Sequence, residues 1–451
     1  MSDLTDLVER VVATSHGTER IEAYAAKGVE TDVRVYEGGI ETLSTATSAG
    51  IGIRVLLDDD AGARVGFAWA GSLDADAVDR ALRSARENAT YATADPMVTL
   101  ATVDGVPAAD VEVSDPGFNE VSLDDKIALA LDAEHQARTM DSRIRQIDSV
   151  DYGDTAVEFA IASSTGVRST ARRTAAYLSV AAIAGDSEET QTGSGLSVGR
   201  GPSALRPGDA ASQAVDRSVR MLGATKAASQ KTVVVFDPRV TSTLLSVIGG
   251  ALSGEAVVKG RSFFEGRLGE RVALDAVTLV DDPTDPRAFG AARFDGEGLA
   301  CRRTTLIEGG ILTSFVYDTV AANRAGTSST GSAVRGGFSG TPSAGCRAVV
   351  LSPGALSAPE VLAEVGTGVY VQSITGVHSG VSPVSGDFSV GAEGLMIRDG
   401  QLAEPFREVT VASTLQRMLQ SIVAIGADLT WLPGVAAGQT LAIADFQLSG
   451  S

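Results

Sequence analysis

The sequence predicts an α+β fold, with duplicated α/β units in the N-terminal half and mainly antiparallel β structure in the C-terminal half, as curled sheets or an open barrel with a few helices. Three observations favour this class. The order helix, strands, glycine turn, strands, helix occurs twice before residue 228, and short strands between glycine-rich turns fill most of the chain beyond it. The chain holds 50 glycines and only 5% aromatic residues, which is typical of many turns and tight β structure. Its 451 residues are too many for one ordinary core, so two domains are expected, 1–228 and 229–451.

The first predicted α/β unit covers residues 1–90. A helix from about Leu4 to Ala26 is followed by Thr31–Gly39, where apolar and polar residues alternate before a glycine turn, as in the first strand of a hairpin. Ser72 is the predicted N-cap of a second helix, because Asp74 and Asp76 fall in its first turn. Between these helices the pattern predicts three more strands: Glu41–Thr47, Gly52–Leu57 and Ala63–Ala70.

An extended connector, residues 91–120, separates this unit from a second one at 121–228, because its prolines and glycines interrupt any helix. The second unit begins with Ser122-x-x-Asp125, a capping-box pattern that opens a helix. It continues with three strands and a closing helix: Arg145–Tyr152, Thr155–Ser163, Tyr177–Gly185 and the helix Asp209–Leu222.

The C-terminal half begins with the continuous apolar strand Thr232–Phe236. Asp237 and Pro238 then form the N-cap and first position of a helix that reaches about Leu252. Two further helices are predicted, one after the box Ser357-x-x-Glu360 and one over Thr414–Ile425. The remaining pattern predicts short strands: Ala276–Val280, Arg303–Glu308, Ile311–Tyr317, Arg347–Leu351, Val369–Gln372, Gly391–Arg398 and Thr440–Leu448.

Charge and composition exclude several classes of function. The net charge of −20 argues against nucleic-acid binding, which requires clustered Lys and Arg. The one local basic group, Arg168 with Arg172 and Arg173, has the alternation of a solvated strand face. No apolar run reaches the roughly 20 residues of a membrane span, and the N-terminus has no signal-peptide pattern, so a cytoplasmic protein is expected. The two cysteines, Cys301 and Cys346, lack metal-binding spacing.

Several segments resemble, in order along essentially the whole chain, the signatures of the TldD/PmbA metallopeptidase-related family. They are Ser48–Val55, Arg172–Thr174, Gln191–Gly193, Lys259–Arg271, Val280–Asp282, Phe294–Gly298, Leu306–Leu312, Pro383–Ser389 and Ile422–Asp428. The resemblance implies a subunit of a two-component protease. Its partner would be a TldD-type subunit that carries zinc and cleaves unfolded or leader peptides presented as extended strands.

In the TldD branch a zinc motif, His-Glu-x-x-x-His, precedes the central signature. Aligned without gaps, the two histidines fall on Leu245 and Gly250 and the glutamate on Ser246. The third ligand of the family, a cysteine, is expected in the segment Trp431–Gly438, which contains none. Zinc needs imidazole or thiolate donors and the hydrolytic water needs a base. The chain therefore resembles the PmbA/TldE-type branch, with no catalytic residue, metal ligand or cofactor of its own.

Two clusters are candidates for contact with a peptide or partner. Arg261, Glu265, Glu270 and Arg271 form a dense cluster of mixed sign, which is either an exposed ion-pair network or a hydrogen-bonding rim; the family signature favours the rim.

The second cluster is a glycine-rich loop with His378, several serines and Asp387. A serine hydrolase would need these groups to converge in space, whereas a tight loop would use them to bond its own backbone. The family resemblance places this loop beside the peptide channel.

Three functions remain open from the sequence. The favoured one is a non-catalytic, peptide-binding subunit that forms a heterodimer with a TldD-type zinc-bearing partner. The second is an autonomous hydrolase that uses His378 or a metal site not recognised in the sequence. The third is a structural or chaperone-like homodimer that binds unfolded segments without cleaving them.

Overall fold

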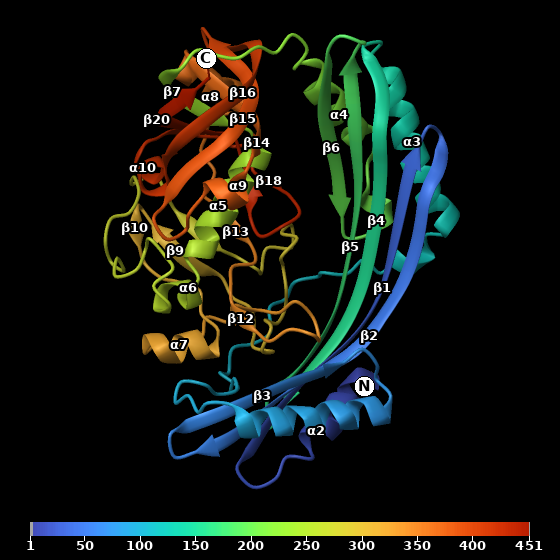
Figure 1. The fold of residues 1–451 in the computed structure, drawn as a ribbon, viewed down its shortest axis with the longest axis vertical. Coiled ribbons are helices and arrows are strands. Elements are labelled where there is room, and N and C mark those ends of the chain that lie inside the picture. The colour runs from blue at the N-terminus through green and yellow to red at the C-terminus, as the bar shows by residue number, and fades with distance from the viewer. Residues whose placement is uncertain (1–2, 451) are drawn as a thin grey trace.

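The computed structural model describes residues 3–450, and its N-terminal half is one curved, six-stranded antiparallel sheet in the order β3-β2-β1-β4-β5-β6 (Figure 1). Pairing of β1 with β4 joins the two predicted units into this single sheet. The hairpin between β1 and β2 turns at Glu37 and Gly38, both with positive φ, as a two-residue type I′ turn requires. The strands are β1 Glu19–Tyr36, β2 Gly39–Asp59, β3 Gly62–Ala70, β4 Ile144–Ser163, β5 Arg168–Gly185 and β6 Thr190–Gly199.

Four helices cover the face of this sheet that is turned away from the C-terminal half (Figure 1): α1 Asp3–Val12, α2 Ala75–Tyr91, α3 Leu123–Met140 and α4 Pro207–Val219. Strand alternation decides which side chains they cover. Ile21, Ala23 and Ala25 of β1 pack with α1 and α2 in one apolar cluster. Glu22 and Tyr24, between them, face the C-terminal half. The inner face of the sheet is therefore available for contacts between the halves.

The connector between α2 and α3 contains only the short 3-10 helix Phe118–Glu120. It runs between the halves of the molecule, where Val111 and Val113 pack against Ala288, Ala291 and Ala348. The connector thus contributes to the boundary between the N-terminal sheet and the C-terminal half.

The C-terminal half is built around a five-stranded barrel, because β16 pairs with β20 and closes the order β16-β15-β14-β7-β20. The pair β7 and β14 is parallel, and the other pairs of the barrel are antiparallel. One more strand, β17 Ile422–Ile425, pairs with β20 outside the ring. The barrel strands are β7 Gln230–Phe236, β14 Gly368–Thr375, β15 Asp387–Arg398, β16 Gln401–Thr414 and β20 Leu441–Ser449.

Shorter elements surround the barrel. A four-stranded sheet has the order β10-β9-β8-β13, and two small pairs are β11 with β12 and β18 with β19. These strands are β8 Leu279–Asp281, β9 Thr304–Glu308, β10 Ile311–Leu312, β11 Ala333–Val334, β12 Ser343–Ala344, β13 Val349–Leu351, β18 Thr430–Trp431 and β19 Ala437–Gly438. The helices are α5 Pro238–Ala251, α6 Gly254–Val258, α7 Thr319–Ala325, α8 Ala358–Val365, α9 Val377–Gly380 and α10 Leu415–Gln420.

The α+β class, the duplicated units and the β-rich second half are confirmed, while two predicted helices are wrong in extent. The first helix ends at Val12, and the chain from Glu19 onward forms β1. Residues Ile21–Ala26 are buried on both faces of the sheet, so their uniform apolar pattern does not distinguish strand from helix. The helix predicted over Thr414–Ile425 ends at Gln420, because Ile422–Ile425 pairs with β20 as β17.

Local capping signals were more reliable. Ser122 with Asp125, and Ser357 with Glu360, both form the predicted capping boxes. Asp237 accepts a hydrogen bond from the Arg239 N–H at the start of α5. Ser72 is not an N-cap; the helix begins later, with Asp74 as its N-cap. None of the helices within residues 3–450 has the length and apolar character that a membrane crossing requires.

Candidate functional site

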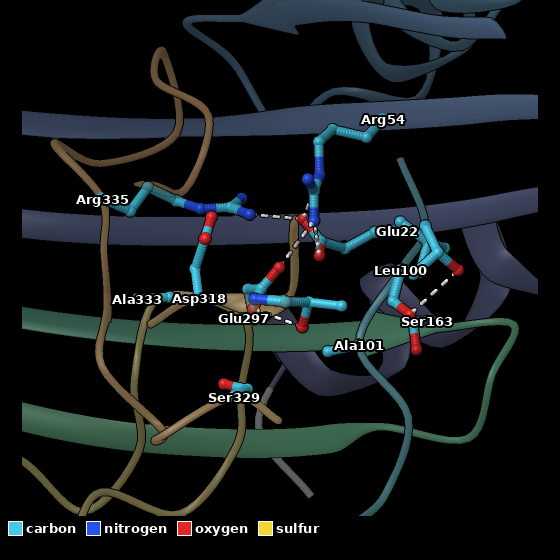
Figure 2. A network of polar contacts seen from close by, with 12 residues as sticks. Glu22, Arg54, Leu100, Ala101, Ser163, Glu297, Asp318, Ser329, Ala333 and Arg335 are labelled. Carbon is cyan, nitrogen blue, oxygen red and sulfur yellow. Dashed lines mark hydrogen bonds and ion pairs between the residues drawn. The ribbon is translucent and has the colours of Figure 1, made fainter. Parts of the chain in front are cut away.

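A buried network of charged side chains joins the inner face of the N-terminal sheet to the C-terminal half (Figure 2). Glu22 of β1 accepts two hydrogen bonds from Arg54 of β2, at 3.0 Å from Nε and 2.5 Å from Nη2. Arg335, which follows β11, donates a third from the opposite side. Burial opposes the charge on Glu22, but Arg335 and Arg54 together lower its pKa to about 2. Glu22 is therefore an anion held between cations from both halves.

Two more carboxyl groups complete the network from the C-terminal side. Glu297 accepts hydrogen bonds from the backbone N–H and hydroxyl of Thr319, at 2.9 and 2.7 Å, and its other oxygen lies 3.8 Å from Arg54 Nη2. Burial raises the pKa of Glu297 to about 7, although Arg54 acts in the opposite direction. Asp318 is the N-cap of α7, and burial raises its pKa as well. The network thus combines a glutamate whose pKa is lowered, Glu22, with carboxyl groups whose pKa values are raised, Glu297 and Asp318.

Two glycines of β2 allow the halves to approach this closely. A side chain at Gly52 would place its Cβ 2.2 Å from the carbonyl oxygen of Phe338, and one at Gly50 would place it 2.5 Å from the Phe338 ring. Gly50, Gly52 and Arg54 are alternate residues and share the inner face of the sheet. The signature Ser48–Val55 therefore has a structural explanation, since it supplies both the space and the cation for contact between the halves.

The segments aligned with the family's zinc ligands lie together in this chain. Ser242 of α5 donates a hydrogen bond to the carbonyl oxygen of Ala436, at 2.7 Å. The chemistry of the aligned positions does not fit zinc, because Leu245 is packed in the main core and Gly250 has no side chain. The hydroxyl of Ser246 donates to the Ser242 carbonyl, at 2.8 Å. Residues 3–450 also contain no group of three or more His, Cys, Asp or Glu arranged to hold a metal ion.

The predicted charged rim, Arg261, Glu265, Glu270 and Arg271, lies exposed in the turns that follow α6. Its charges are partly paired: Glu270 with Arg267 at 3.0 Å, and Arg271 with Asp275. The backbone N–H of Phe263 bonds to the carbonyl oxygen of Pro383, at 3.0 Å. This bond brings the signature segment beside the His378 loop. A shared contact surface for a peptide or partner stays a prediction.

His378 lies on α9 and is exposed. Asp387, at the start of β15, accepts a hydrogen bond from the Ser385 hydroxyl at 2.7 Å. Within residues 3–450, His378 forms no hydrogen bond with a serine or with Asp387. The loop therefore bonds its own residues, and the spacing of a serine hydrolase triad is not assembled.

Sequence reasoning missed the charged network between the halves. Arg54 stands alone among apolar residues of a strand, which is a signal for a buried ionic contact, whereas Glu22 follows Glu19 and Arg20 and gives no such signal. Their partner Arg335 lies in a glycine-rich loop 313 residues from Glu22, and no local pattern connects the two.

Known protein families match successive parts of nearly the whole chain. Family models described as PmbA/TldA metallopeptidase domain 1, central domain and C-terminal domain match residues 21–89, 116–222 and 229–450. The chain is 27% identical over 443 residues to the metalloprotease PmbA of Escherichia coli O157:H7, and the match covers 96% of this chain and 94% of that protein.

Solved structures are similar in fold over the whole length. A structure from Thermotoga maritima, named as a modulator of DNA gyrase, has a TM-score of 0.89 at 23% identity, covering 98% of this chain and 99% of that one. TldE from Thermococcus kodakarensis has a TM-score of 0.88 at 23% identity, covering 99% of both chains. With three successive family domains and a full-length relative, the chain belongs to the PmbA/TldD metallopeptidase family.

Proposed function

We propose that this chain is the non-catalytic, peptide-binding subunit of a two-component metalloprotease whose TldD-type partner carries the zinc. The observation that carries the proposal is the chemistry of α5. Its aligned positions hold Leu245, Ser246 and Gly250, of which the first lies in the core and the second bonds its own helix. With these three residues, α5 can support the fold, but it supplies no metal donor and no base for hydrolysis. The water-activating metal is therefore assigned to the partner.

An open sheet edge supports a role in binding extended peptides. The strands of the C-terminal barrel are paired in a closed ring. One long open edge belongs to β2, because β3 pairs only with Ile51–Asp59. Within residues 3–450, no strand pairs with the outer edge of residues 39–49. This stretch is exposed and has one charged residue, Glu41. Backbone pairing at such an edge makes little demand on peptide sequence.

The test compares the purified chain, a TldD-type subunit with the His-Glu-x-x-x-His motif, and their mixture, on an unstructured fluorogenic peptide. We expect cleavage by the mixture only, and no stoichiometric zinc in this chain when it is purified alone. Leu43→Lys should weaken cleavage by the mixture, since a lysine on an open edge opposes strand addition. Met140→Lys is the matched control, because Met140 ends the helix α3, where no strand can add, and is exposed to 44%, as Leu43 is. Size-exclusion chromatography confirms that both variants still join the partner.

The other two functions are alternative outcomes of this test. Cleavage by this chain alone, lost in His378→Ala, would establish an autonomous hydrolase. Binding of the peptide by this chain with no cleavage in any mixture would establish a chaperone-like role. In the proposed complex, His378→Ala weakens cleavage moderately through binding and does not abolish it, because the metal belongs to the partner.

A further inference from the structure

A small cavity lies next to the charged network, between the inner face of the N-terminal sheet and the C-terminal half. Its volume is about 100 Å³. The sheet contributes Tyr24, Phe159 and Arg173, and the C-terminal half contributes Arg293, Arg335 and Arg347, among other residues. Four arginines around so small a space are unexpected in a chain with a net charge of −20.

Many of the guanidinium donors at this cavity have no partner in the protein. Within residues 3–450, the side chains of Arg173 and Arg293 form no hydrogen bond or ion pair, but both residues are exposed, so water can satisfy their donors. Arg335 is 2% exposed, and its Nε and Nη1 atoms are buried without an acceptor. The Nε of Arg347 is buried and unpaired as well. Since buried donors are normally satisfied, the unpaired atoms of Arg335 and Arg347 indicate an acceptor that the protein itself does not supply.

The nearby carboxylates do not fill this role. Asp295 lines the cavity, but its oxygens accept backbone hydrogen bonds from Glu297, Leu299 and Ala333, at 2.9–3.0 Å. Glu22 is occupied by Arg54 and by the Nη2 of Arg335. Partial burial of the guanidinium is the main cause that lowers the pKa of Arg173, and the like charge of Arg347 lowers it further. Arg173 and Arg347 therefore repel each other, while Asp281 and Asp295 attract Arg347, and an anion at the cavity would relieve the repulsion.

Part of the cavity lining is apolar and aromatic, and the Arg335 guanidinium lies over the Tyr24 ring, 4.9 Å from its centroid. The rings of Tyr24 and Phe159 are stacked, with centroids 5.6 Å apart and an angle of 16° between planes. Val113, Val157 and Ala291 complete this side. A wall of this kind suits a short hydrocarbon group, and the planar guanidinium fork matches a carboxylate. A cavity of about 150 Å³ accommodates benzene, so one of this size takes a group no larger than a small carboxylic acid.

We propose that this cavity is a binding site for a carboxylate with a short aliphatic tail, held between Arg173, Arg293, Arg335 and Arg347. The ligand is a small free acid or the terminal carboxylate of a peptide. Arg173 is exposed, as the sequence predicted, and it also lines this cavity, whereas Arg172 lies on the other face of β5. The proposal does not depend on a zinc-bearing partner, because the whole cavity is formed by this chain.

Isothermal titration calorimetry of the full-length chain with propionate tests the proposal. Propionate should bind saturably, and propionamide, which has the same shape without the charge, should not bind. Arg173→Gln should weaken propionate binding about tenfold to 100-fold, since a hydrogen bond to a charged group is lost. Arg172→Gln, the neighbouring arginine on the other face, should bind propionate like the wild type.

Competition against propionate identifies the source of the carboxylate. The competitors are a peptide with a free C-terminal alanine and the same peptide with a C-terminal amide. Displacement by the free peptide alone identifies a chain end, and displacement by neither identifies a free acid.

A stability measurement separates binding from folding. Arg173 has no partner to lose, so without ligand Arg173→Gln should melt at or above the wild-type temperature. A lower melting temperature would mean that Arg173 has a structural role, and would overturn the proposal. Equal binding of propionamide and propionate, undiminished binding by Arg173→Gln, or no saturable binding of propionate would also overturn it. Tighter binding of inorganic phosphate than of propionate would refute the carboxylate class.

Discussion

Glu22 and Arg335 form an ion pair across 313 residues of sequence, and this pair links β1 to the loop that follows β11. Both side chains are almost completely buried, at 1% and 2% exposure. Because Arg54 binds the same carboxylate from β2, one anion neutralises cations from both halves of the molecule. The contact between the halves is therefore ionic at this point and not simply apolar.

Removing Glu22 should cost more stability than removing Arg335. Glu22→Gln leaves the buried Arg335 without an anion and leaves Arg54 only the more distant Glu297, at 3.8 Å, so we expect a loss of about 3–5 kcal/mol in the free energy of unfolding. Arg335→Met should cost less, because Arg54 still neutralises Glu22. Urea denaturation measures both. Arg34→Ala, which breaks a half-exposed pair with Asp151 in the same sheet, should change stability by no more than about 1 kcal/mol. A larger loss for Arg335→Met than for Glu22→Gln would contradict this ranking.

Stability should depend on pH through Glu297. Burial raises its pKa to about 7 from an ordinary value of 4.5, so the folded chain retains a proton that the unfolded chain releases between these values. The resulting stabilisation is complete below pH 4.5 and is lost as the pH rises through 7. Between pH 5 and 8, the wild type should therefore lose on the order of 2 kcal/mol more than Glu297→Gln, which stays neutral. Glu265→Gln, an exposed carboxyl group, should follow the wild type. Parallel curves for wild type and Glu297→Gln would rule out this linkage.

Gly52→Ala should destabilise the contact between the halves. The added Cβ would lie 2.2 Å from the backbone oxygen of Phe338, which cannot move without displacing its loop. Such overpacking typically costs about 1–3 kcal/mol. Gly39→Ala in the same strand is the control, because its nearest neighbour would be 3.9 Å away. Differential scanning calorimetry compares them, and equal melting temperatures would show that the loop adapts freely.

The helix α5 offers a matched pair of substitutions with opposite effects. Leu245 is 3% exposed in the main core, so Leu245→Ala should cost about 2–5 kcal/mol. Gly250 is exposed and a Cβ there meets nothing within 4 Å, so Gly250→Ala should stabilise the helix by up to about 1 kcal/mol. Thermal melting distinguishes the two. An unchanged melting temperature for Leu245→Ala would mean that the helix is not part of the core.

The sequence predicted the features that local chemistry determines. The caps at Ser122, Asp237 and Ser357 were found because capping is read within four residues. The burial of Leu245 followed from helical spacing after a clear N-cap. The first part of β1, up to Ala26, was mistaken for helix because both of its faces are covered there, which removes the alternation that reveals a strand.

Long-range relationships could not be predicted in this way. The family signature around Gly52 was recognised, but its reason, the approach of Phe338, depends on a loop far along the chain. The cavity lined by Arg173 likewise requires residues from both halves. The side chains named for peptide or partner contact, including His378 and Arg261, lie at the surface, and their contact with a second molecule stays a prediction.

The separation of Glu22 from Arg335 also has a consequence for how the chain is made. On the ribosome, β1 emerges 313 residues before the arginine that completes its inner face. The N-terminal sheet can already fold against its four helices, because their apolar contacts are internal to residues 3–219. Glu22 and Arg54 then remain hydrated until the C-terminal half is synthesised. Dehydration of this pair is therefore a late event in the maturation of the protein.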